Sequence, residues 1–384
     1  MYPDQSSIIA IDFIGELLML TMLVCNVWRL RSRAREDRLL RMMVVCTMVG
    51  CLMDQVWFSS IDIDGTVIAA PILISNTLLY VAEMVTCYCW ALFINIHMRG
   101  SVSKLTRIIL SVPIAVSLAL LLANLFTPLL FHVDDKSIYN RLPLSALLIC
   151  FAYSYFVYAL GLYIRLRQRS GGLRLFPGWA LMFPVVLGGT VQLIYPGAPT
   201  FWASVCVGIA GTITSLQNED IYRDRLSRLY NRAFLEYVCS GKLKRASTEM
   251  TGVMIDLNGF KTINDKLGHN VGDQALVNAA HIIRDSVGDI GIATRYAGDE
   301  FVVLLNTTDD AVVNQTMDEM RRRFQSFNST GTHPYELSAS MGQFKMVPGK
   351  QSVEEFIANI DRAMYGDKKR YYEEHPEADR RASR

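Results

Sequence analysis

The chain has 384 residues, enough for two domains, and 51% of them are hydrophobic, which is high for a wholly soluble protein. Its formal net charge of only +2 excludes the overall basic character of a nucleic-acid-binding protein, so no nucleic acid partner is expected. Up to Leu216 there are 15 Lys and Arg residues and 11 Asp and Glu residues. From Gln217 onward there are 23 Lys and Arg residues and 25 Asp and Glu residues, and these are spread evenly along the sequence. This difference predicts a membrane part followed by a soluble part.

Seven stretches approach the ~20 predominantly apolar residues that a membrane-spanning helix needs. The first has no basic segment before it and no small-residue cleavage site, so we expect it to remain as a membrane anchor. Residues 1–216 are therefore predicted to form an all-α bundle of seven transmembrane helices that contacts membrane lipid. The predicted spans are Ile8–Trp28, Leu39–Phe58, Ile68–His97, Leu105–Phe131, Pro143–Ile164, Phe176–Tyr195 and Phe201–Leu216.

Basic residues crowd into alternate connections between these spans. The first connection carries six arginines between Arg29 and Arg41, and the third and fifth are also rich in Lys and Arg. The second, fourth and sixth connections are poorer in them. Because short basic loops stay on the cytoplasmic side, we expect the N-terminus outside and the part that follows the seventh span in the cytoplasm.

Four acidic residues fall inside the predicted spans: Asp12, Glu16, Asp54 and Glu83. Ionisable groups within a membrane are costly and often mark a polar cavity or ligand site, so one hypothesis is an outward-facing sensory pocket for an unknown ligand. The alternative is that they only form hydrogen bonds between helices or lie at the membrane interface. The sequence leaves both interpretations open.

Residues 217–231 are predicted to be a helical linker that leaves the last span. Leu216, Ile221, Leu226 and Leu229 form a loose apolar stripe, too short and irregular for a coiled coil. A helix that transmits dimer geometry and a plain connector are equally compatible with this stripe.

Residues 232–372 alternate between helical and β patterns and predict an α/β domain with a mixed, mainly antiparallel sheet. Residues 373–384 read as a charged, frayed tail. Helices are expected at Arg232–Gly241, Phe260–Leu267, Asp273–Val287, Asp309–Ser326 and Val353–Arg370, and strands at Gly252–Asp256, in the hairpin Ala293–Leu305 and at Tyr335–Phe344.

Three places in this domain carry chemistry. An apolar strand ends in Asp256. The segment from Phe260 to Asp273 combines Lys261, suited to phosphate, with Asn264 and Asp273, suited to a base edge. The segment Arg295-Tyr-Ala-Gly-Asp-Glu-Phe301 predicts a hairpin tip with two adjacent carboxylates, which suits a divalent metal near phosphates.

The order and spacing of these residues resemble the GGDEF domain of diguanylate cyclases. The resemblance covers roughly Ile221–Arg370 and includes Ile255-Asp-Leu-Asn-Gly-Phe-Lys261, Asn264, Gly272-Asp273 and the hairpin signature. It implies a nucleotidyl-cyclase-like fold and the condensation of two GTP into cyclic di-GMP with release of pyrophosphate. It also implies a homodimer, because each domain holds one GTP. Together with the predicted spans, it leads us to expect the chain in a bacterial plasma membrane.

The resemblance further implies roles for individual residues. Asp256, the backbone carbonyl of Leu257, Asp299 and Glu300 would bind Mg²⁺ or Mn²⁺, two ions per GTP site. Asp299 and Glu300 would be catalytic, with Glu300 assisting activation of the 3′-hydroxyl. Lys261 and Lys368 would bind phosphates, whereas Asn264 and Asp273 would recognise guanine.

Four features depart from the family pattern. Ala297 stands where the signature has its first glycine, and Asn258 replaces a common second acid. The usual inhibitory Arg-x-x-Asp site reads Gly288-Asp-Ile-Gly291, which argues against product inhibition through that site. Arg370-Tyr-Tyr372 replaces the usual Gly-Arg-Asn, so one phosphate contact is absent or comes from Lys369 or Arg370.

Two alternatives belong to other functional classes. The domain is either an active cyclase or a catalytically silent receptor that binds GTP or a protein, and the retained acidic and amide residues favour the enzyme. A transporter or channel with a regulatory domain is disfavoured, because the spans show no paired broken helices or obvious inverted repeats.

Overall fold

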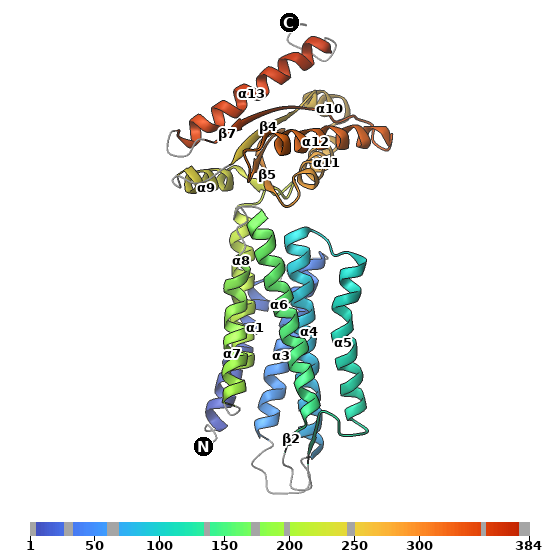
Figure 1. Cartoon of the computed structure of the whole chain (residues 1–384), viewed down its shortest axis with the longest axis vertical. Helices are drawn as coiled ribbons and strands as arrows, with labels where there is room; N and C mark the ends of the chain where they lie inside the picture. The colour runs from blue at the N-terminus through green and yellow to red at the C-terminus, as the bar shows by residue number, and fades with distance from the viewer. Residues whose placement is uncertain are drawn as a thin grey trace. The chain divides into compact units, whose positions relative to one another are not determined.

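The computed structural model describes residues 5–26, 34–59, 69–133, 139–169, 177–195, 200–243, 250–346 and 351–375. The chain divides into two compact units, which are described separately below (Figure 1). The first unit comprises Met1–Arg165 and Phe176–Gln217, and the second comprises Leu166–Leu175 and Asn218–Arg384.

The first unit is a bundle of helices, and each predicted span overlaps one of them over the residues that the structure describes. In the part of the chain that is described, four helices are long and apolar enough to cross a membrane: Arg35–Trp57, Ala70–Arg99, Lys104–Asn124 and Pro143–Arg169. The helices are α1 (Gln5–Cys25), α3 (Arg35–Ser59), α4 (Ala69–Arg99), α5 (Lys104–Asn124), α6 (Ala146–Arg169), α7 (Gly178–Ile194) and α8 (Phe201–Ile221).

The outer faces of this bundle are apolar. Phe13, Ile108 and Val157 expose 59%, 64% and 70% of their surface. Large apolar side chains on the outside of every helix are unusual in a soluble bundle, whose outer face is normally polar. The pattern is typical of helices surrounded by lipid.

The fourth predicted span is wrong at its end, because α5 stops at Asn124 rather than continuing to Phe131. The Oδ1 atom of Asn124 accepts the backbone N–H groups of Leu129, Leu130 and Phe131 at 2.7–3.3 Å. These bonds turn the chain into a short antiparallel hairpin of β1 (Phe131–Val133) and β2 (Tyr139–Arg141), after which the 3₁₀ turn η1 (Pro143–Ser145) leads into α6.

The second unit is built on a five-stranded sheet with the order β3-β5-β6-β4-β7. Only the β3–β5 pair is parallel among these strands, so the predicted mixed and mainly antiparallel sheet is confirmed. The strands are β3 (Tyr230–Asn231), β4 (Thr251–Leu257), β5 (Gly291–Ala297), β6 (Glu300–Leu305) and β7 (Ala339–Lys345).

Helices cover both faces of this sheet. A hydrophobic core lies on each face of the sheet, and alternate residues of β4 point into one core or the other. Val253 and Ile255 face α11 and α12, whereas Met254 faces α9 and α13. Strand β4 is therefore buried on both faces, which explains its nearly continuous apolar sequence. The helices are α9 (Arg232–Leu243), α10 (Phe260–Leu267), α11 (His269–Val287), α12 (Asp310–Ser329) and α13 (Val353–Glu374).

The prediction of a helical linker over 217–231 is wrong beyond Ile221, where α8 ends. Asp224 accepts hydrogen bonds from the backbone N and the Oγ of Ser227 at 2.7 Å, which closes a turn. Arg228 then adopts a φ of 60°, which no helix allows. The chain thereby reverses direction and enters β3.

The end of the domain also differs slightly from prediction. Helix α13 continues through Glu374, two residues into the segment expected to be a frayed tail. The Ser352 hydroxyl and the Glu355 side chain cap its start reciprocally. His375 ends this helix, and residues 376–384 of the predicted tail lie outside the described residues.

Candidate active site

The tip of the β5–β6 hairpin presents Asp299 and Glu300. Gly298, between the two strands, has a φ of +46°, a backbone conformation that glycine adopts without a steric penalty. The Nε of Arg295 donates to the carbonyl oxygen of Gly298 at 2.9 Å. The two carboxylates therefore lie on a turn whose shape is fixed from within the hairpin.

Arg295 also ties this hairpin to the segment that follows α8. Its Nη1 donates to Oδ1 of Asp224 at 3.1 Å, the same oxygen that Ser227 uses. Burial raises the pKa of Asp224, but the hydrogen bonds from Ser227 and Arg295 and the guanidinium charge lower that pKa overall. Arg295 thus supports the hairpin through hydrogen bonds, and its charge also acts on the carboxylate of Asp299.

The alanine in the signature causes no backbone strain. Among the described non-glycine residues, only Arg228 has a positive φ, so Ala297 does not occupy a conformation reserved for glycine. Its methyl group is exposed at the end of β5. The departure at Ala297 therefore leaves the shape of the hairpin intact.

Asp256 on β4 lies beside the hairpin tip. It is directly opposite Glu300 in the β4–β6 register and is 4% exposed. The next residue, Leu257, donates its backbone N–H to the carbonyl oxygen of Asp299 at 3.3 Å. The structure thus brings together the predicted acidic residues of two segments more than 40 positions apart.

These carboxylates repel one another. Burial, and then the charge of Asp256, raise the pKa of Asp299 above its usual value. Burial, followed by the charges of Asp256, Asp299 and Asp361, raises the pKa of Glu300. Clustered acids with raised pKa values are typical of a site that receives a cation.

The residues present suit a magnesium ion that arrives with its substrate. In the described chain no three side chains of His, Cys, Asp or Glu form a metal cage by themselves. Mg²⁺ is usually held by one or two carboxylates together with substrate phosphates rather than by an all-protein cage. Asp256 fits this pattern, because it places one buried carboxylate opposite Glu300 at the end of the sheet.

Lys368 of α13 reaches the same carboxylate from another helix. Its Nζ lies 2.7 Å from Oδ1 of Asp256 and donates to Oδ2 at 2.7 Å. Sequence reasoning missed this ion pair, whose partners are 112 positions apart. Lys368 was predicted to contact phosphates, and the structure places its ammonium group among the predicted metal ligands.

Two further contacts hold α13 in the register that places Lys368. The Oδ2 atom of Asp367 accepts the backbone N–H of Met341 on β7 at 2.9 Å. The hydroxyl of Tyr371 lies 3.4 Å from the Oγ of Ser338, which precedes the same strand. Neither Asp367 nor Tyr371 was identified from the sequence, because contacts between a helix and a strand about 30 positions away leave no local motif.

Asn258 has a structural role where a second acid is common in the family. It is 7% exposed, and its Oδ1 accepts the Ser340 hydroxyl at 2.8 Å. Its backbone N–H donates to the carbonyl oxygen of Ser338 at 2.9 Å. Asn258 therefore joins the end of β4 to β7.

The predicted nucleotide-recognition residues lie on α10 and α11, directly after β4. Lys261 and Asp273 are exposed, and Asn264 is half-buried. A Cβ on Gly272 would lie 1.9 Å from Oδ1 of Asn264, so this amide rests against the glycine backbone of the neighbouring helix. The structure thus brings Asn264 next to the turn of α11 that carries Asp273.

The last turns of α13 supply no obvious replacement for the missing phosphate-binding arginine. Arg370 pairs with Asp367 at 3.0 Å, and Lys369 lies 3.8 Å from Glu373. Tyr372 packs edge-on against Tyr371, with ring centroids 5.4 Å apart. Both candidate cations are thus engaged along their own helix.

The four acids predicted for the sensor region divide into two places. Asp12 and Asp54 are 0% and 4% exposed and, with Glu16, interact electrostatically between α1 and α3. Both carboxylate oxygens of Asp12 are buried and accept no hydrogen bond within the described chain. Glu83 lies apart from them on α4, where its charge interacts with that of Arg141.

Comparisons with known proteins identify the second unit. The family described as "Diguanylate cyclase, GGDEF domain" matches residues 221–373. The diguanylate cyclase DosC of Escherichia coli (strain K12) is 29% identical over 160 residues, which cover 40% of this chain and 35% of that protein. The bifunctional diguanylate cyclase/cyclic di-GMP phosphodiesterase MucR of Pseudomonas aeruginosa is 32% identical over 146 residues, or 37% and 21% of the two chains.

A solved structure of the GGDEF domain of PA1120 (TpbB or YfiN) from Pseudomonas aeruginosa is 31% identical. The matched region covers 38% of this chain and 89% of the chain in that structure, with a TM-score of 0.35. The chain spans about a third or less of the length of the two curated relatives named above. Residues 221–373 of this chain belong to the GGDEF domain family of diguanylate cyclases.

Proposed function

We propose that the chain is a membrane-bound diguanylate cyclase that condenses two GTP into cyclic di-GMP and releases pyrophosphate. The observation that carries this proposal is the convergence of Asp256, Asp299 and Glu300, from two strands of a GGDEF domain, with the ammonium group of Lys368. Three acids and one lysine at a sheet end suit a metal-bound triphosphate.

In this proposal, Asp256 and Asp299, with the carbonyl of Leu257, would hold Mg²⁺ or Mn²⁺, and Glu300 would contribute to a second ion. Bound there, the ions would supply the positive charge that neutralises the triphosphate during in-line displacement at the α-phosphorus. Glu300 has a raised pKa, which suits it to accept the 3′-hydroxyl proton.

The remaining site residues bind and orient GTP. Lys261, at the start of α10, and Lys368 are assigned to the phosphates. Asn264 and Asp273 are assigned to the guanine edge, where a carboxylate accepts from two adjacent N–H donors. Each domain holds one GTP, so the reaction needs two copies of the chain face to face, and activity per chain is expected to rise with protein concentration.

We place the first unit in the bacterial plasma membrane as a regulatory region of seven spans. The proposed boundaries are 1–216 for this region, 217–231 for the linker, 232–372 for the GGDEF domain and 373–384 for the tail. The apolar outer faces of the first unit and the four long apolar helices among the described residues support its place in a membrane. The arginine-rich connections support an outer N-terminus and a cytoplasmic GGDEF domain. Asp12, Glu16, Asp54 and Glu83 remain candidates for signal detection.

The decisive assay uses the purified full-length chain in lipid nanodiscs with GTP and Mg²⁺. We expect cyclic di-GMP and pyrophosphate in a one-to-two ratio, measured by chromatography with mass spectrometry. GTP binding without any product, under conditions where the protein forms dimers, would instead support a silent GTP-binding receptor.

Gly272→Ala tests the assignment of Asn264 to the substrate. The new methyl group would displace the Asn264 amide, whose Oδ1 would lie 1.9 Å away, but only a side-chain end has to move. We expect KM for GTP to rise by about fivefold, the effect of one lost hydrogen bond, with no loss of thermal stability because alanine favours a helix.

Asn264→Ala provides the comparison, because it should raise KM by a similar factor. If Gly272→Ala leaves KM unchanged while Asn264→Ala raises it, the packing of the amide against Gly272 is not what positions it. If neither variant changes KM, Asn264 does not bind GTP.

A further inference from the structure

The ion pair between Lys368 and Asp256 has a geometry that bears on metal binding. The Nζ atom of Lys368 lies 2.7 Å from each carboxylate oxygen of Asp256. The side chain of Asp256 is 6% exposed and that of Lys368 is 27% exposed. A buried carboxylate is costly to desolvate unless a cation partners it, so the ammonium group stabilises Asp256 in its charged form.

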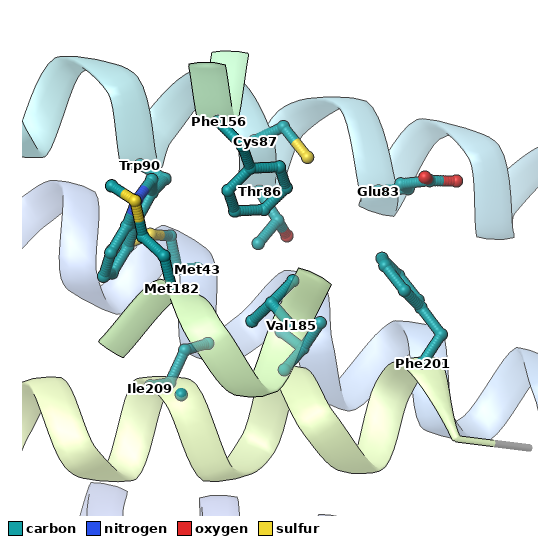
Figure 2. Close-up of a pocket in the computed structure, with 12 residues that line it drawn as sticks. Met43, Glu83, Thr86, Cys87, Trp90, Phe156, Met182, Val185, Phe201 and Ile209 are labelled. Atoms are coloured by element: carbon teal, nitrogen blue, oxygen red, sulfur yellow. The ribbon is translucent and has the colours of Figure 1, made fainter. Parts of the chain in front are cut away.

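Burial alone does not bring a cation to an acid in this chain. Glu83 lines a pocket in the first unit, and Figure 2 shows that the labelled side chains around it include no Lys or Arg. Exposed pairs also occur, such as Lys369 with Glu373, whose side chains are 71% and 62% exposed. Exposed pairs contribute little, whereas loss of one partner from a buried pair is costly. The contact of Lys368 with Asp256 is therefore a specific feature of the site.

The charge of Lys368 also reaches the tip of the hairpin. Burial raises the pKa values of Asp299 and Glu300, and the negative charge of Asp256 raises them further. Lys368 acts in the opposite direction on both carboxylates. One ammonium group thus offsets part of the repulsion among three acids, which is also the electrostatic effect of a divalent cation in such a site.

A divalent ion and this ammonium group compete for the same carboxylate. A metal ion that took an oxygen of Asp256 would meet the Nζ of Lys368 at short range, and two cations repel each other strongly at a buried site. Lysine is suited to exchange, because its ammonium group is a point charge on a flexible stem. The side chain of Lys368 is partly exposed, so it can leave Asp256 while α13 stays in place.

We propose that Lys368 is a resident counter-ion that hinders a free divalent metal ion from binding to Asp256. A triphosphate offers the ammonium group more negative charge than one carboxylate does, so the metal ion enters together with its nucleotide. Mg²⁺ is usually held jointly by carboxylates and substrate phosphates, which suits this order. The inference rests on the proposed function, because it takes Asp256 as a metal ligand, and it adds a role for Lys368 that precedes contact with phosphate.

The test is a titration with Mn²⁺, without nucleotide, of the full-length chain in nanodiscs of zwitterionic lipid. Electron paramagnetic resonance of free Mn²⁺ gives the bound fraction, and empty nanodiscs provide the blank. Lys368→Met removes the ammonium group and keeps the length of the side chain. We expect its Kd for Mn²⁺ to be at least about tenfold lower than that of the unaltered chain, because one positive charge beside the ion is removed.

Two controls locate the effect. Lys369→Met makes the same change one residue further along α13, where the ammonium group lies 3.8 Å from Glu373, and it should leave the Kd unchanged. Asp256→Asn, combined with Lys368→Met, should remove the gain in affinity, because the carboxylate that Lys368 had occupied is then missing.

A Kd that is unchanged or higher in Lys368→Met would overturn the inference. A gain that survives Asp256→Asn would also overturn it, because the ion would then bind elsewhere. If Lys368→Met does not fold, Lys368→Gln keeps a hydrogen-bond donor without the charge and carries the same expectation. The titration uses no GTP, so a chain without cyclase activity can still show the gain, whereas an active chain without the gain refutes only this role of Lys368.

Discussion

Replacing Asp299 with asparagine is expected to abolish cyclic di-GMP synthesis while making the GGDEF domain more stable. Asp299 is assigned to the metal ion, and an amide oxygen provides neither the charge nor the affinity of a carboxylate for Mg²⁺. Loss of several kcal/mol of transition-state stabilisation corresponds to a rate decrease of at least about a hundredfold. The full-length chain in nanodiscs, assayed with GTP and Mg²⁺, measures this loss.

The gain in stability follows from the raised pKa values. The folded domain holds the protons of Asp299 and Glu300 to a higher pH than the unfolded chain, whose values are near 3.8 and 4.5. Ionisation of these groups therefore destabilises the fold: stability falls as the pH rises through the folded pKa, and the whole penalty is present at neutral pH. Asparagine removes one of the repelling charges, so Tm at neutral pH should rise by on the order of 2 °C.

The change in Tm is best followed by circular dichroism on residues 217–384, which contain their own two hydrophobic cores. Asp285→Asn is a suitable control, because Asp285 lies in an exposed pair with Arg284 near the end of α11, three turns from Asp273. It should alter neither activity nor Tm. Turnover that survives in Asp299→Asn would refute the metal-binding role, and a lower Tm would refute the electrostatic explanation.

A second large effect is expected for Gly342→Ala on β7. An added Cβ would lie 1.9 Å from the backbone N of Met364 and 2.3 Å from the carbonyl carbon of Ala363. Because both obstacles are backbone atoms of α13, the helix and the strand have to separate. Overpacking of this kind costs about 1–3 kcal/mol or more, which corresponds to a decrease of roughly 2–12 °C in Tm.

Separation of β7 and α13 should also reduce catalysis below Tm, because Lys368 follows Met364 by one helical turn and must reach Asp256 on the strand beside β7. Gly366→Ala provides the matched control on the same helix. No atom lies within 4 Å of its added Cβ, so it should stabilise the domain by about 0.5–1 kcal/mol through helix propensity. If Gly342→Ala leaves both Tm and activity unchanged, the close packing of α13 on β7 does not position Lys368.

The sequence was most informative where local patterns decide the structure. The apolar run before Asp256 and the paired runs around Gly298 predicted β4 and the β5–β6 hairpin, because short strands bounded by turn residues have few alternatives. The start of α13 was also predicted correctly, and its capping pair Ser352 and Glu355 explains why.

Boundaries set by distant contacts were predicted poorly. Strand β7 begins at Ala339 rather than Tyr335, because Leu337 forms its backbone hydrogen bonds with the side chain of Asn328 instead of a strand. The two-residue strand β3 was missed, since its parallel pairing with β5 joins segments more than 60 positions apart. The early end of α8 depends on Asp224, whose partner Arg295 is 71 positions away.

The candidate site divides in the same way. Its residue types were identified from the sequence, whereas the ion pair of Lys368 with Asp256 and the anchoring of α13 by Asp367 depend on how helices pack against the sheet. The chemical type of a site residue can be read from the sequence, but the distance between two site residues depends on the tertiary structure.

The side chain of Arg295 joins two parts of the domain that are far apart in the sequence. Its Nη1 contacts Asp224 in the segment that follows α8, and its Nε contacts the carbonyl oxygen of Gly298 in the turn before Asp299 and Glu300. Because both contacts belong to one planar guanidinium, the positions of the entering segment and of this turn are coupled without any contact through the hydrophobic cores.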